Sequence, residues 1–145
     1  MNDLSRAVTR QKIEELQESM MEIRCDAPEP RHFFSPGVYL REFSMPKGML
    51  CVGRRHKHDH LMVIRSGSAE IVSEFGRDIV KGGDIFESKA GVKRVVYALE
   101  DVTFITIHHN PENLTDIDTI ESMITEEEGF KPEFRKSVSI EDLSK

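Results

Sequence analysis

The sequence gathers potential metal ligands in one short run, where His56, His58 and His60 occupy alternate positions. If this segment is a β-strand, the three imidazoles share one face, because successive side chains point to opposite faces. Neutral imidazole binds divalent metals at pH 7, so the candidate cofactor is one ion of Zn, Fe, Mn or Ni. On a straight strand His56 and His60 would lie about 13 Å apart, so one ion can use both only if the chain bends. The alternative interpretation is a solvated polar run on an edge strand.

Two glycine-bounded stretches, Gly48 to Gly67 and Gly83 to Arg94, have a spacing that resembles the paired motifs of the cupin superfamily. The first family motif is G-x5-H-x-H-x(3,4)-E-x6-G, and the second is G-x5-P-x-G-x2-H-x3-N. The resemblance covers residues 32–111. It implies an all-β core with the fold of a cupin-type double-stranded β-helix, or jelly roll.

At the ligand positions of cupins, this sequence departs from the family pattern. The first histidine position holds Arg54, the second holds His56, and the glutamate position holds His60. The last histidine position holds Arg94, whose guanidinium keeps its proton and cannot donate a lone pair to a metal. The family's three-His-one-Glu site is therefore not carried over intact, and His56 and His60 remain, joined by His58 if the strand slips. Cations facing these histidines predict a small carboxylate or phosphate ligand, with Arg94 as a bidentate clamp.

Three other side chains are candidates for the site, each with a structural alternative. His108 shares a strand face with Phe104 and Thr106 and would contact a ligand if that face points inward, although a histidine at a strand end is more often structural. Tyr97 is either a pocket acid or a core aromatic whose hydroxyl finds a partner. Glu87 is either a general base or a surface carboxylate. The sequence contains no Ser-His-Asp order, P-loop or dinucleotide fingerprint.

The segment from Ala90 to His108 is similar to a subgroup of small cupin-like proteins encoded by bacteriophages. Proteins of that subgroup have an N-terminal helix, a Lys-Arg pair after the second-motif turn and a closing Thr-Ile-His strand. Their activity is undefined. The resemblance therefore implies a setting, the host cytoplasm, but no reaction.

The elements that must position these residues divide the single domain into three parts. Residues 1–30 are predicted to be an N-terminal helix, over 3–24, and a proline-containing linker. Residues 31–111 are expected to form a β-barrel, because their short β-rich segments alternate with turn signals and favour an antiparallel sandwich or barrel. The resemblance implies that this barrel is of the cupin type. Residues 112–145 are predicted to be a C-terminal helix and a polar tail. The expected strands cover 38–40, 49–52, 61–64, 69–72, 79–80, 95–99 and 102–107.

The composition is that of a globular protein of 145 residues, with 38% hydrophobic and 32% charged residues. No segment approaches the ~18 apolar residues of a membrane span, and the start does not resemble a signal peptide. The net charge of −6 argues against a nucleic-acid partner. Two cysteines, Cys25 and Cys51, are too few for a disulfide framework, so a cytoplasmic setting is expected. Edge strands flanked by helices predict a homodimer.

Three functional hypotheses remain open at this point. The first is a cupin-like protein that binds a small anionic ligand with the help of a His-ligated divalent metal. The second is a metal-dependent enzyme, of dioxygenase, isomerase or lyase type, that acts on a small acid. The third is a non-catalytic phage accessory or structural protein. The arginines at ligand positions and the missing glutamate favour a non-catalytic role, but one fold hosts many functions.

Overall fold

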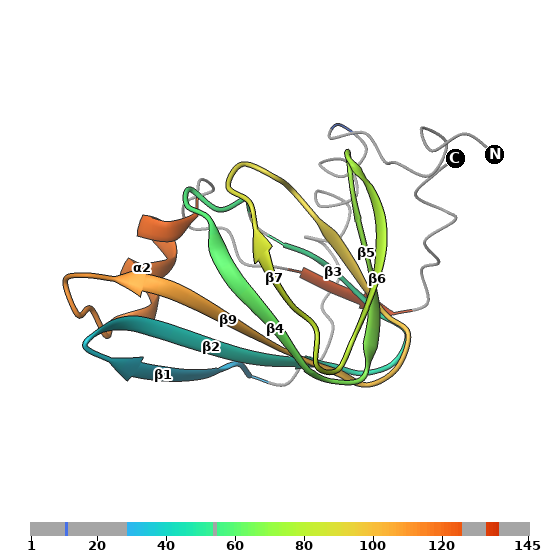
Figure 1. Ribbon diagram of the computed structural model, residues 1–145, viewed down its shortest axis with the longest axis horizontal. Helices are drawn as coiled ribbons and strands as arrows, with labels where there is room; N and C mark the ends of the chain where they lie inside the picture. Colours follow the sequence, from blue (N-terminus) through green and yellow to red (C-terminus); the bar gives the residue numbers. More distant parts are fainter. Residues whose placement is uncertain (1–10, 12–28, 54, 126–132, 137–145) are drawn as a thin grey trace.

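In this computed structural model the described part of the chain comprises residue 11 and residues 29–53, 55–125 and 133–136. Its strands form two five-stranded antiparallel sheets (Figure 1). The first sheet has the strand order β1-β2-β9-β4-β7 and the second has the order β10-β3-β8-β5-β6. The first sheet contains β1 (Arg31–Ser35), β2 (Gly37–Met45), β9 (Val102–Asn110), β4 (His60–Ser66) and β7 (Ile85–Ser88). The second contains β10 (Glu133–Lys136), β3 (Met49–Val52), β8 (Val95–Ala98), β5 (Ser68–Ser73) and β6 (Gly76–Lys81).

The structure confirms the all-β core. Six of the seven expected strands lie within a strand of the two sheets, and the one expected over 95–99 ends one residue earlier, at Ala98 of β8. Strands β1, β7 and β10 were not predicted from the sequence. Strand β10 falls in the stretch expected to be a polar tail, where it pairs with β3 and sets Phe134 opposite Cys51. The helix predicted over 3–24 lies outside the described residues apart from Gln11, which is helical, and Cys25 and Arg54 also lie outside them.

The core lies between the sheets and follows from the alternation of side chains along each strand. In β9, burial alternates from Val102 to Asn110, so that one face of the strand points inward. The apolar side chains that both sheets direct inward pack tightly against one another, and their burial is the main apolar contribution to stability. The core cluster consists of Met45, Met49, Cys51, Ile64, Ala69, Ile71, Val80, Val96, Ala98, Val102 and Phe104.

The connection between β4 and β5 carries the chain from one sheet to the other and depends on Gly67. This residue has φ +81°, a left-handed conformation that residues with a Cβ rarely adopt. A Cβ atom added at Gly67 would lie 1.9 Å from the carbonyl oxygen of Asp101. The glycine that ends the first motif is therefore required both by its backbone angle and by the close approach of the neighbouring chain.

The predicted C-terminal helix is present as α2 (Ile117–Ile124), which follows β9 and lies beside the end of that strand (Figure 1). Asp116 caps the helix, because its carboxylate accepts the Thr119 backbone N–H at 3.1 Å. Ile120 is the buried residue of α2 and anchors it. Among the described residues, no helix combines the length and the hydrophobicity needed to span a membrane.

Candidate metal centre

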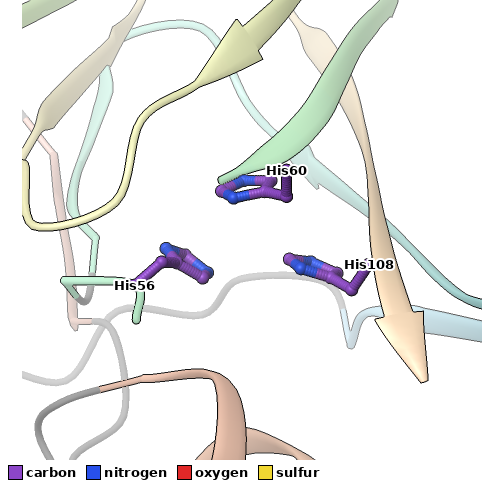
Figure 2. Close-up of side chains that lie close together, drawn as sticks. All are labelled: His56, His60 and His108. Carbon is purple, nitrogen blue, oxygen red and sulfur yellow. The ribbon is translucent and has the colours of Figure 1, made fainter. Parts of the chain in front are cut away.

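Three imidazoles converge at one end of the core. Figure 2 shows the rings of His56, His60 and His108 pointing toward a shared space. Each histidine offers one ring nitrogen as a ligand atom, and these three nitrogens all lie within 4.8 Å of one another. The ring centroids are 4.3 Å apart for His56 and His60, 4.6 Å for His60 and His108, and 5.5 Å for His56 and His108. This separation suits three ligands of one ion.

A bend in the chain brings the first and last histidines of the run together. The chain bends at Lys57 and His58, and β4 begins only at His60. The rings of His56 and His60 are therefore neighbours instead of lying about 13 Å apart on a straight strand. His58 lies at the bend, is exposed and is not part of the group; it lines an open pocket of about 390 Å³ with Asp59. The structure thus brings together two of the three histidines predicted to bind metal.

The third imidazole comes from β9, which lies beside β4. Leu61 of β4 pairs with Ile107 of β9, so the strand ends that carry His60 and His108 are adjacent. Alternation along β9 directs His108 inward, where it is 6% exposed, and leaves His109 exposed. From the sequence, His108 was predicted to be a ligand contact and not a metal ligand, because spacing along the chain does not reveal which strands pair.

Backbone contacts from two segments fix the position of His56. Its carbonyl oxygen accepts the N–H of Gly91, in the second-motif turn, at 2.9 Å. It also forms an isolated antiparallel bridge with Thr125, immediately after α2. The next residue, Lys57, donates its N–H to the carbonyl oxygen of Ile124 at 2.7 Å. The turn of the second motif and the end of α2 therefore hold the loop that carries His56.

Burial keeps two of the imidazoles neutral. Burial, with a contribution from the Arg94 charge, lowers the pKa of His60 to about 4, although the main chain of His58 and the Asp59 carboxylate act in the opposite direction. Burial also lowers the pKa of His108 to about 2, together with the charges of the other two imidazoles and of Arg41. Neutral imidazole is the form that binds a metal, so both side chains are ready to act as ligands at pH 7.

The hydrogen bonding of the cluster fits a divalent metal. His60 is 6% exposed, and neither of its ring nitrogens makes a hydrogen bond of normal distance and angle within the described part of the chain, although the His58 main chain lies near enough to affect its pKa. A buried polar group without a partner costs about 1–3 kcal/mol, which a metal–nitrogen bond would offset. The Nε2 atom of His108 is hydrogen-bonded to the Thr106 hydroxyl at 2.9 Å, as the second nitrogen of a metal-bound histidine commonly is. An all-imidazole set suits Zn, Fe or Ni better than Ca or Mg.

The three histidines line a cavity of about 90 Å³ that also contains positive charge. Arg94 lines its wall, as the resemblance to cupins suggested, and so does Arg41 of β2. Apolar and polar side chains share the rest of the wall, which is a mixture typical of small-ligand sites. The other lining residues are Tyr39, Phe43, Cys51, Gly53, Met62, Ser88, Val92, Val96, Thr106, Glu121, Ile124 and Thr125.

Neither guanidinium forms an ion pair with a carboxylate of the described residues. The Arg94 guanidinium has one long hydrogen bond, 3.4 Å to the carbonyl oxygen of Val92, and burial lowers the pKa of Arg94. The Nε atom of Arg41 is buried and has no hydrogen-bond partner. Arg41 was not predicted from the sequence, although a signal was present: on an extended segment Arg41 shares a face with Tyr39 and Phe43.

The two candidates for general acid or base lie away from this cavity. Tyr97 follows Val96, which lines the cavity, so the alternation of β8 directs Tyr97 to the opposite face of the sheet. Glu87 is exposed and forms an ion pair with Lys89. Of the described residues that line the cavity, Glu121 of α2 is the one with a carboxylate.

Comparisons with known proteins identify the fold. No protein-family model and no curated protein matches the sequence. Ectoine synthase from P. lautus is a similar solved structure, with a TM-score of 0.57 over 88% of both chains at 14% sequence identity. KdgF from Halomonas sp. has a TM-score of 0.51 and 17% identity over 64% of this chain and 90% of its own. A cupin-2 domain containing protein from Shewanella frigidimarina has a TM-score of 0.50 and 13% identity over 64% and 91%.

These similarities, together with the two facing antiparallel sheets, show that the chain has the cupin fold, as the two motifs suggested. At this level of identity they define the architecture and not the chemistry. The chemistry must be argued from the histidines and arginines of this chain.

Proposed function

We propose that this protein binds one divalent metal ion through His56, His60 and His108 and holds a small anionic ligand beside it. The observation that carries the proposal is the convergence of the three imidazoles within 4.8 Å on a cavity that they share with Arg41 and Arg94. Three nitrogens bound to one ion at about 2.1 Å lie roughly 3–3.5 Å apart, so binding requires only a small inward adjustment of the side chains.

The anionic ligand follows from the electrostatics of the cavity. Two guanidinium groups beside a cation would repel it, unless an anion lies among the three charges. A carboxylate can bind a metal with one oxygen and accept charge-assisted hydrogen bonds from a guanidinium with the other. Arg94 occupies the last ligand position of the cupin motif, so here it supplies an anion contact at the place where cupins have a metal ligand.

The test is metal binding by the untagged full-length protein. The protein is stripped with a chelator, titrated with Zn, Fe, Mn or Ni, desalted and analysed by plasma mass spectrometry. We expect one ion per chain in the unmodified protein and loss of that ion in His56→Ala, His60→Ala and His108→Ala. His58→Ala and His109→Ala remove exposed imidazoles from the same two segments and serve as matched controls that keep the ion. A protein that binds no metal, or loses it in His58→Ala but not in His108→Ala, contradicts the assignment.

A metal-dependent enzyme acting on a small acid is the second candidate function. The observation that favours it is Glu121, a carboxylate on the wall of the same cavity that could accept a proton from a bound ligand. When bound, the metal would supply Lewis-acid activation of that ligand. If the protein is an enzyme, the metal-loaded form consumes a small acid and Glu121→Gln stops turnover while metal and ligand still bind. If it is a non-catalytic binding protein, the bound acid is recovered unchanged.

A further inference from the structure

The two arginines of the cavity, Arg41 and Arg94, form no ion pair with a carboxylate of the described residues, whereas three arginines elsewhere do. Arg31 and Arg65 both pair with Glu42, at 3.2 and 2.8 Å, and Arg77 pairs with Glu70 at 3.6 Å. Arg41 and Arg94 have no such partner among the described residues. Within the described part of the chain, three guanidinium groups outside the cavity are therefore paired with a carboxylate, whereas the two around the histidines are not.

Leaving these charges unpaired is costly inside a cavity. Burial of a charge without a counter-charge or hydrogen bonds is strongly unfavourable, because the group loses its hydration. Arg41 recovers part of this through the ring of Phe43, whose centroid lies 5.4 Å from its guanidinium carbon. The buried Nε of Arg41 remains without an acceptor, and Arg94 has only its long contact with Val92. Both groups lack the acceptors that a bound anion would bring.

The arginines reach the cavity from different places. Arg41 projects from the middle of β2, in the first sheet, and its charge acts on His108. Arg94 precedes β8, in the second sheet, and its charge acts on His60. The carboxylate of Glu121 also lines the cavity and offsets one positive charge. Two guanidinium groups and a divalent ion outweigh that single carboxylate, so the cavity has positive charge for more than one anionic group.

We infer that the ligand is a small dicarboxylate, with one carboxylate held by Arg41 and the other by Arg94. This inference rests on the proposed anion binding beside the metal and specifies the ligand further. Guanidinium and carboxylate groups are both planar and form paired hydrogen bonds, so two separate forks recognise two carboxylates better than one tetrahedral anion. The cavity of about 90 Å³ is well below the size of most drug-like sites, which restricts the ligand to a short carbon chain.

The inference is tested by titration calorimetry of the full-length protein, in chelator-stripped and Zn-loaded forms, with malonate, succinate, acetate and inorganic phosphate at constant ionic strength. We expect malonate or succinate to bind at least about tenfold more tightly than acetate or phosphate in the Zn-loaded protein. Arg41→Gln and Arg94→Gln should each reduce dicarboxylate affinity to the level of acetate. Arg41→Lys and Arg94→Lys keep the charge without the fork and should recover part of it. Arg65→Gln, at a surface ion pair, should have no effect.

Equal affinity for acetate and malonate overturns the inference, as does a preference for phosphate over both dicarboxylates. Unchanged malonate binding in Arg41→Gln overturns the role of Arg41, because Arg94 alone would then account for the anion. If the protein binds metal through the histidines in these experiments and shows no dicarboxylate preference, only the ligand class is wrong. If it binds neither metal nor any of the anions, the proposed function itself fails. Circular dichroism of each glutamine variant, with its lysine counterpart, separates lost affinity from lost folding.

Discussion

Acid should destabilise the metal-free protein in the range where ordinary carboxylates are still largely ionised. The responsible groups are His60 and His108, whose pKa values lie at about 4 and about 2 in the folded protein, below the value of 6.5 that each has when exposed. At pH 5 both imidazoles are charged in the unfolded chain and neutral in the folded one. The unfolded state then binds more protons, so the free energy of unfolding decreases as the pH falls from about 6.5 toward 4.

The size of this effect follows from the two pKa values. At pH 7.5 neither state binds a proton at these sites, and the contribution is close to zero. At pH 5 each histidine lowers the free energy of unfolding by about 2 kcal/mol, so that together they lower it by as much as about 4 kcal/mol. Burial also lowers the pKa of His32, which adds a smaller change in the same direction.

Urea denaturation of the chelator-treated protein at several pH values between 7.5 and 5 measures this loss. His60→Gln should remove about half of the pH dependence, because glutamine is polar but does not titrate. His109→Gln changes an exposed histidine of the same strand end as His108 and should leave the dependence intact. A free energy of unfolding that stays constant over this range would refute the reasoning, since it would mean that the buried imidazoles accept protons without penalty. Equal slopes in the His60→Gln and unmodified proteins would refute it as well.

Two further predictions concern the elements that hold the site. Gly67→Ala should lower the free energy of unfolding by about 3 kcal/mol or more, because the added Cβ would lie 1.9 Å from the Asp101 carbonyl oxygen. Gly91 has φ +77° but open space around it, so Gly91→Ala should lower the free energy of unfolding by only about 1 kcal/mol in the same urea experiment. Asp116→Ala should remove the cap of α2 at a cost of about 1 kcal/mol and increase hydrogen exchange at the following residues, and a helix that exchanges as slowly as before would contradict the capping role.

Local patterns in the sequence were sufficient for much of the fold. Short segments rich in β-branched or aromatic residues, bounded by turn signals, marked strands such as 61–64 and 102–107, because these side chains favour the extended backbone of a pleated, half-buried sheet. Isoleucines at helical spacing after an acidic cap marked α2 for a similar reason. Strand β10 left no such trace, since its place depends on pairing with β3 and not on its own composition.

The candidate site, too, could be predicted from the sequence only in part. The sequence by itself determined that His56 and His60 lie in a cupin-like motif and that Arg94 stands where a ligand is usual, because these are facts of residue type and spacing. Only the tertiary structure decided that the chain bends at His58, and that His108 and Arg41 join the cavity. The physical reason is that a cavity is enclosed by strands brought together through long-range pairing, and the order of residues along one strand does not specify which other strand lies beside it.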